Sequence, residues 1–104
     1  MVTARRADRN FSEILEALRV HLPEVRERYH VTTLGVFGSY VRGEQGRRSD
    51  LDILVEFSQA PTFLQFLSLE EELCAALGVK VDLVMRKALK PAIGRRILAE
   101  VVMV

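Results

Sequence analysis

Two short apolar runs in this chain carry carboxylates, and this feature constrains the possible fold more than any other. The first run reads LDILV at residues 51–55 and directly follows Asp50. The second reads VKVDLV at residues 79–84. An apolar run predicts burial, yet carboxylates are rarely buried unless they are paired or bound to a cation. The fold must therefore bring these acids to a place where their charge is balanced.

Side chains alternate across a β-strand, so Asp50 and Asp52 share one face of the first run. The opposite face is expected to pack on the core: Leu51, Ile53, Val55 and Phe57. In the second run, Asp82 lies opposite a similar apolar set: Val79, Val81, Leu83 and Met85. If the two strands are neighbours with matched faces, the three aspartates converge. Because such carboxylates repel one another they need a cation, and oxygen ligands favour Mg²⁺ or Mn²⁺ over zinc.

Gly38 and Ser39 follow another apolar run and suit a phosphate group. Glycine lets the backbone approach a ligand closely. The serine would stand at a helix N-terminus, where free N–H groups and the positive end of the helix dipole attract phosphate. Taken singly, Asp-x-Asp is often a strand edge, and Gly-Ser is often a turn and helix cap. Their combination indicates a site for a metal-bound polyphosphate and hence phosphoryl or nucleotidyl transfer.

Apolar periodicity and capping residues predict alternating helices and strands. A helix begins after Asn10, which forms a capping-box pattern with Glu13, and Pro23 either ends this helix or starts a second turn. Residues 1–9 are polar and expected to be frayed. Further elements are expected as strands at 31–37, 51–57 and 79–85, helices at 39–43, 63–77 and 91–100, and a short terminal strand at 101–104. This alternation predicts the α/β or α+β class, with helices packed on a small mixed sheet in a single domain, 1–104.

Composition argues against several classes of function. Hydrophobic residues make up 49% of the 104 residues and charged residues 28%, a balance that argues against wholesale disorder. The formal net charge of +1 and the scattered arginines offer no basic stripe to nucleic acid. Cys74 is the single cysteine, and no apolar stretch is long enough for a membrane span or a signal peptide. We therefore expect a cytoplasmic protein that binds neither membranes nor nucleic acid.

The motifs together resemble the nucleotidyltransferases of the DNA polymerase β superfamily, whose signature is Gly-Ser, a spacer, Asp-x-Asp and a third carboxylate on a later strand. FGSYVRG at residues 37–43 and SDLDILV at residues 49–55 look most like the minimal nucleotidyltransferases of bacteria and archaea. Ten residues separate Ser39 from Asp50, a spacing that this family uses. The resemblance runs from about Phe11 to ILAEVV at residues 97–102. Val41, where alanine is commoner, is a conservative departure.

The resemblance implies a role for each matching residue. Asp50 and Asp52 would bind the metal ions, and Asp82 would complete the metal site and help to deprotonate the incoming hydroxyl. The nucleotide phosphates would be held by Gly38 and Ser39. Arg42 would either touch phosphate or anchor the loop by pairing with Glu44 or Glu56.

The resemblance also implies an activity and a partner. Many minimal nucleotidyltransferases are the antitoxins of toxin–antitoxin pairs whose partner is a helical ribonuclease toxin of the HEPN class. This chain would then move AMP from ATP onto a hydroxyl of that toxin, with tyrosine the expected acceptor. Two alternatives stay open: an idle antitoxin that neutralises its partner by binding, and nucleotidyl transfer to another acceptor. Assembly with itself or with the partner is also open.

Three further segments have simpler interpretations. Cys74 lies among apolar helix residues and is expected to be an inert thiol. The run of three glutamates at 70–72 is expected to be a solvated helix face. The apolar end at 101–104 is expected to add to a sheet edge, with partner contact as the second choice.

Overall fold

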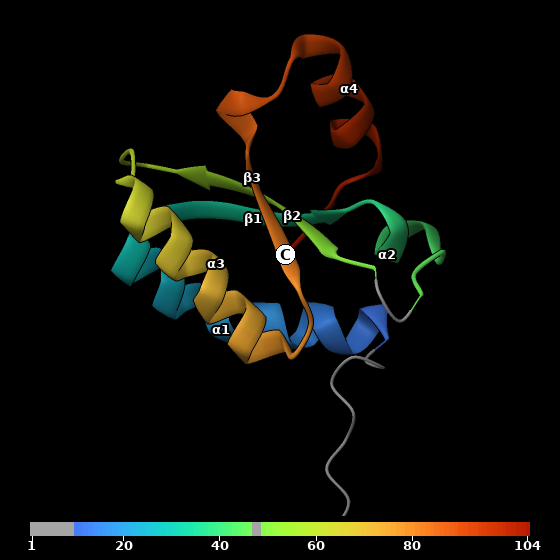
Figure 1. The fold of residues 1–104 in the computed structure, drawn as a ribbon, viewed down its shortest axis with the longest axis horizontal. Coiled ribbons are helices and arrows are strands. Elements are labelled where there is room, and N and C mark those ends of the chain that lie inside the picture. Colours follow the sequence, from blue (N-terminus) through green and yellow to red (C-terminus); the bar gives the residue numbers. More distant parts are fainter. Residues whose placement is uncertain (1–9, 47–48) are drawn as a thin grey trace, which may run out of the picture.

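The computed structural model describes residues 10–46 and 49–104, and it has helices on both sides of a mixed four-stranded sheet (Figure 1). The strand order is β3-β2-β1-β4, with β1 antiparallel to β2 and β4, and β2 parallel to β3. This confirms the expected fold class. The elements are α1 Phe11–Tyr29, β1 Val31–Phe37, α2 Ser39–Arg42, β2 Leu51–Phe57, α3 Phe63–Leu77, β3 Val81–Met85, the 3₁₀ turn η2 Arg86–Ala88, α4 Pro91–Glu100 and β4 Val102–Met103.

Helix α1 begins at the expected capping box. The Glu13 N–H donates to the Asn10 side chain at 2.8 Å, and the Asn10 N–H donates to the Glu13 carboxylate at 3.0 Å. Pro23 does not end the helix, because α1 continues through this exposed residue to Tyr29. The backbone then turns at His30, whose φ is 61°, and enters β1.

Helices α1 and α3 lie side by side and cover one face of the sheet (Figure 1). Helix α3 also returns the chain to the starting end of the sheet, as a parallel β2–β3 pair requires. The fully buried core comes from these two helices and from the inner faces of the strands: Ile14, Leu18, Val25, Leu34, Val36, Leu51, Ile53, Val55, Leu69, Leu73 and Leu77. The apolar face expected for β2 is therefore the core face.

Helix α4 lies on the other side of the sheet and buries none of its side chains fully (Figure 1). The chain then adds β4 to the free edge of β1, where Met103 pairs with Gly35 and Val102 with Val36. The expected sheet-edge role of the C-terminal segment is confirmed. Within the described residues, no helix is long and apolar enough to cross a membrane.

The glutamates of α3 correct one expectation from the sequence. Glu70 accepts the Leu83 N–H at 2.9 Å, and Glu72 accepts the Tyr29 hydroxyl at 3.0 Å, so these two residues do not belong to a purely solvated face. For Glu70 the reason is that β3 is an edge strand, whose outward N–H groups need acceptors, and for Glu72 it is the packing of α3 beside α1. Strand β3 also starts at Val81 rather than residue 79. The expectation for residues 1–9 lies outside the described residues.

Candidate active site

The register of the parallel strands brings the expected carboxylates together. Asp52 of β2 pairs directly with Asp82 of β3, and Asp50 lies two residues earlier, just before β2 begins. Residues directly opposite on neighbouring strands have their side chains on the same face. The expected neighbouring of the two acid-bearing strands is therefore observed.

Burial and neighbouring charges disfavour the ionised form of the Asp52 carboxyl. Burial raises the pKa of its carboxyl above the ordinary value, and the charges of Asp82 and Asp50 raise it further. The nearby Arg42 guanidinium lowers this pKa, but its effect is smaller than theirs. The cluster thus holds more negative charge than its protein neighbours balance, and a bound cation would relieve the repulsion.

The donor chemistry suits a divalent cation, although the side chains do not form a finished metal cage. Within residues 10–46 and 49–104, no group of three Asp, Glu, His or Cys side chains is arranged closely enough to hold a metal. Asp82 is exposed, and the Asp50 side chain is 40% exposed with Lys80 at 4.0 Å, so both can reorient. Mg²⁺ is commonly held by one or two carboxylates together with substrate phosphates. The residues therefore fit a metal that arrives with a nucleotide and draws the carboxylates together.

Gly38 brings the Gly-Ser corner against this cluster. Its φ of 83° and ψ of −151° lie in a backbone region that residues other than glycine rarely adopt. A Cβ atom on Gly38 would overlap Oδ2 of Asp52. The backbone then turns into the short helix α2, whose first residue is Ser39. The Gly-Ser corner and the aspartates therefore belong to one site.

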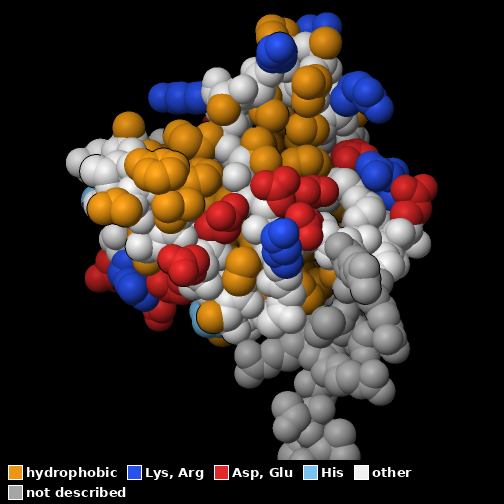
Figure 2. Space-filling model, in the orientation of Figure 1, with side chains coloured by type: hydrophobic (Ala, Val, Ile, Leu, Met, Phe, Trp, Pro, Cys, Tyr) orange, Lys and Arg blue, Asp and Glu red, His pale blue; other side chains and the backbone are white. Residues whose placement is uncertain are grey.

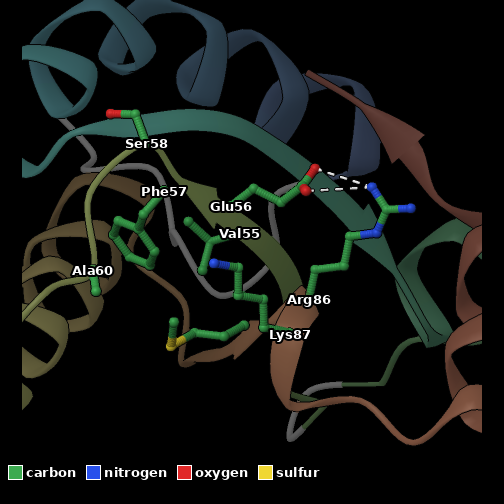
Figure 3. A pocket seen from close by; sticks show the side chains of 8 residues that line it. Val55, Glu56, Phe57, Ser58, Ala60, Arg86 and Lys87 are labelled. Carbon is green, nitrogen blue, oxygen red and sulfur yellow. Dashed lines mark hydrogen bonds and ion pairs between the residues drawn. The ribbon is translucent and has the colours of Figure 1, made fainter.

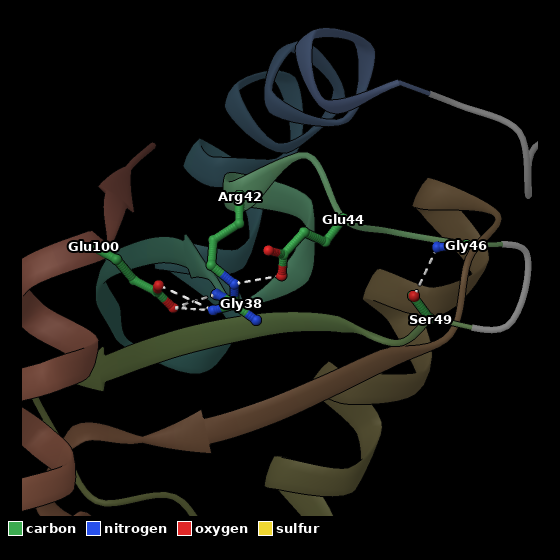
Figure 4. A network of polar contacts seen from close by, with 6 residues as sticks. All are labelled: Gly38, Arg42, Glu44, Gly46, Ser49 and Glu100. Atoms are coloured by element: carbon green, nitrogen blue, oxygen red, sulfur yellow. Dashed lines mark hydrogen bonds and ion pairs between the residues drawn. The ribbon is translucent and has the colours of Figure 1, made fainter.

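Arg42 joins the Gly38 corner to the C-terminal end of α4 (Figure 4). Its Nε donates to Glu44 at 2.8 Å, and its Nη1 donates to the two carboxylate oxygens of Glu100 at 3.0 and 3.2 Å. The pairing expected with Glu44 is observed. The pairing with Glu56 is not, since Glu56 pairs with Arg86 at 3.3 Å.

Glu100 is the residue that sequence reasoning missed. Its carboxylate also accepts the Gly38 N–H at 2.7 Å, and this bond lowers the pKa of Glu100 below its ordinary value. A weak signal existed in the sequence. An acidic residue at the C-terminal end of a helix faces the negative end of the helix dipole, so it is unfavourable unless something pairs with it.

Two clefts lie near opposite ends of β2. One, of about 520 Å³, opens between α4 and the Gly38 corner and is lined in part by Arg42, Arg96 and Glu100. The other, of about 450 Å³, lies at the opposite end of β2 around Phe57 and Arg86 (Figure 3). Of these two clefts, the first borders the corner that carries the expected phosphate-binding residues.

Hydrophobic side chains are exposed on the same face of the molecule as acidic ones. Figure 2 shows acidic side chains gathered on one face, with hydrophobic side chains on two sides of them. Phe63 and Leu64 at the start of α3 are each 74% exposed, and Ile93 of α4 is 50% exposed. Exposed hydrophobic patches commonly mark contact surfaces for other proteins.

The electrostatics of Asp52 lead to a pH-dependent stability. A carboxyl whose pKa is raised by folding binds its proton more tightly in the folded chain. Its contribution to stability is fully present below the unfolded-state value, 3.8, and is lost as the pH rises through the folded-state value. We expect the free energy of unfolding of the wild type, relative to Asp52→Asn, to fall as the pH rises from about 4 toward 7. Urea unfolding in EDTA measures this, and a difference independent of pH would contradict the charge cluster.

Comparison with known proteins agrees with the fold. The family model described as a nucleotidyltransferase domain matches residues 18–104. The chain therefore belongs to the nucleotidyltransferase domain family. This confirms the minimal nucleotidyltransferase expected from the motifs.

Individual relatives narrow the comparison further. The chain is 53% identical over 92 residues to the protein adenylyltransferase MntA of Thermococcus cleftensis, covering 88% of this chain and 93% of the relative. A solved structure assigned to the minimal nucleotidyltransferases is 37% identical, with a TM-score of 0.74, covering 86% of this chain and 92% of that one. The crystal structure of a toxin–antitoxin with AMP-PNP is 26% identical, with a TM-score of 0.65, covering 88% of this chain and 69% of that one.

Proposed function

We propose that this chain is a Mg²⁺-dependent adenylyltransferase that moves AMP from ATP onto a tyrosine hydroxyl of a cognate HEPN ribonuclease toxin, and so acts as its antitoxin. Mn²⁺ can serve in place of Mg²⁺. The observation that carries the proposal is the pairing of Asp52 with Asp82 beside the Gly38 corner. A carboxylate cluster next to a backbone turn at the start of a helix suits a metal-bound triphosphate.

In this proposal the three carboxylates divide the work. Asp50 and Asp52 bind the divalent cation, and Asp82 completes the metal site. When bound, the cation neutralises charge on the triphosphate and makes the acceptor hydroxyl more acidic. The hydroxyl oxygen then bonds to the α-phosphorus, its proton passes to Asp82, and the bond to the leaving pyrophosphate breaks. The raised pKa of Asp52 supports a cation site here, because burial and the charges of Asp82 and Asp50 disfavour its ionised form unless a cation is bound.

The phosphate end of the substrate is assigned to the Gly38 corner. Ser39 offers its backbone N–H and its hydroxyl to the phosphates, Gly38 lets the backbone approach them closely, and Arg42 offers its guanidinium. The cleft of about 520 Å³ next to Gly38 and Arg42 supports this assignment, because it leaves room beside the corner.

A protein acceptor is favoured by the relatives and by the surface. The Thermococcus cleftensis relative is named as a protein adenylyltransferase, and the AMP-PNP-containing relative is a toxin–antitoxin. The exposed Phe63 and Leu64 of α3 and Ile93 of α4 suit docking of a protein better than of a small molecule.

The proposal is tested by mass spectrometry of the partner. The toxin encoded beside this chain is incubated with it, ATP and Mg²⁺, and then digested to locate any modified residue. We expect AMP on a tyrosine, absent when EDTA replaces Mg²⁺, together with loss of ribonuclease activity. A toxin that is silenced without any mass gain would instead establish neutralisation by binding, and label on another molecule would establish a different acceptor.

A further inference from the structure

Glu100 stands at the junction between the C-terminal segment and the proposed phosphate-binding corner. It is the last residue of α4, and the short strand β4 comes soon after it. Its Oε2 accepts the Gly38 N–H at 2.7 Å, and both of its carboxylate oxygens accept from Arg42 Nη1. One side chain thus contacts two of the residues assigned to phosphate binding (Figure 4).

These contacts fix the direction of the Arg42 guanidinium. The group is planar and carries five N–H donors in a fixed arrangement. Nε is engaged by Glu44 and Nη1 by Glu100, so the plane is held on two sides. Among the hydrogen bonds of the described residues, none uses the two donors on Nη2. The contacts with Glu44 and Glu100 therefore leave the Nη2 edge of the guanidinium available to a ligand.

The same carboxylate fixes the peptide that touches Asp52. Gly38 has a conformation that other residues rarely adopt, and its backbone lies against the Asp52 carboxylate. A charge-assisted hydrogen bond to the Gly38 N–H holds this peptide plane in one orientation. Glu100 therefore links the orientation of the corner to the orientation of Arg42.

Helix α4 offers few other contacts that would explain why Glu100 is placed here. None of its side chains is fully buried, and Ile93 and Leu98 are 50% and 41% exposed. An acid in the last turn of a helix is also unfavourable by itself. The pairing of β4 with β1 and the contacts of Glu100 are what tie the end of this helix to the site.

We propose that Glu100 is a positioning residue for nucleotide binding, which acts by holding the Gly38 peptide and the Arg42 guanidinium in the orientation that receives the phosphates. The inference rests on the proposed function, since it takes a nucleoside triphosphate as the ligand. Glu100 itself does not touch the reacting atoms. It makes the C-terminal segment part of the phosphate-binding corner.

The test is a double-mutant cycle on nucleotide affinity. Binding of a non-hydrolysable ATP analogue with Mg²⁺ is measured by calorimetry for the wild type, Glu100→Ala, Arg42→Ala and the double variant. We expect Glu100→Ala to weaken binding roughly tenfold or more, the scale of one charge-assisted hydrogen bond. In the Arg42→Ala background the same change should have a much smaller effect, because Arg42 carries much of the action of Glu100. Glu100→Gln, which keeps an acceptor, should recover part of the lost affinity, and Glu71→Ala on the exposed side of α3 should bind like the wild type.

Several results would overturn the inference. Unchanged affinity in Glu100→Ala would show that the contacts are incidental. Tighter binding would show that Glu100 competes with phosphate for the corner, and an equal loss in both backgrounds would show a general structural role. If Glu100→Ala does not fold, the near-isosteric Glu100→Gln carries the same cycle. A wild type that binds no analogue would overturn the proposed function and this inference together, whereas normal wild-type binding with unaffected Glu100 variants would overturn the inference alone.

Discussion

Replacing Asp52 with asparagine should remove nucleotidyl transfer almost completely while leaving the fold intact. Asp52 has Asp82 directly opposite it on β3, and it takes part in the proposed metal site. Loss of one carboxylate ligand removes several kcal/mol of charge stabilisation from the transition state, which corresponds to a fall in rate of roughly 10³-fold or more. The measurement is transfer of labelled AMP from ATP to the partner toxin, compared at equal protein concentration.

The stability of Asp52→Asn separates catalysis from folding. The ionised Asp52 carboxylate is disfavoured by burial and by two neighbouring acids, so the neutral amide should leave the free energy of unfolding at pH 7 unchanged or slightly higher. Glu71→Gln is the matched control, because it also replaces an acid by its amide at an exposed position on α3. If Asp52→Asn kept its activity, Asp52 would not be a catalytic residue. If the variant did not fold, its loss of activity could not be assigned to catalysis.

Replacing Gly38 with alanine should impair both stability and activity. The new methyl group would overlap Oδ2 of Asp52, and the backbone would be held at a positive φ that L-residues avoid. We expect a loss of roughly 2–4 kcal/mol in the free energy of unfolding, from backbone strain and the clash together. The displaced carboxylate should lower transfer by about 100-fold or more, since catalysis tolerates little misplacement. Urea unfolding and AMP transfer measure the two effects.

Gly43 provides the matched control for Gly38. It also has a positive φ, 72°, but a Cβ atom there would meet nothing within 4 Å. Gly43→Ala should therefore cost only the backbone term, about 1 kcal/mol, and keep most of the activity. Equal behaviour of the two alanine variants would show that contact with Asp52 does not explain the requirement for glycine at residue 38.

Most of the fold could be predicted from the sequence because its signals are local. The capping box at Asn10, the apolar alternation of residues 51–57 and the glycine after residue 77 each act within a few residues. The bounds of β1, β2 and α3 follow directly from such patterns. The convergence of Asp52 and Asp82 was also predictable, since strand alternation and a shared face need only the assumption that the two strands are neighbours.

The features that could not be predicted depend on contacts between distant segments. Glu100 reaches Arg42, which is 58 residues away, and Glu70 reaches the edge strand through a fold that periodicity does not specify. A charged side chain on a helix looks solvated from its sequence alone, because its partner is decided by tertiary packing. The pairing of Arg42 was only partly foreseen for the same reason, since Glu44 is two residues away and Glu100 is not.

The most direct test is a crystal structure of the chain grown with Mn²⁺ and a non-hydrolysable ATP analogue, with anomalous scattering used to locate the metal. The account expects manganese within about 2.0–2.3 Å of carboxylate oxygens from Asp50, Asp52 and Asp82. The phosphates should lie against residues 38 and 39. Manganese bound away from these three side chains, or a nucleotide on a different face of the sheet, would contradict the proposed catalytic site.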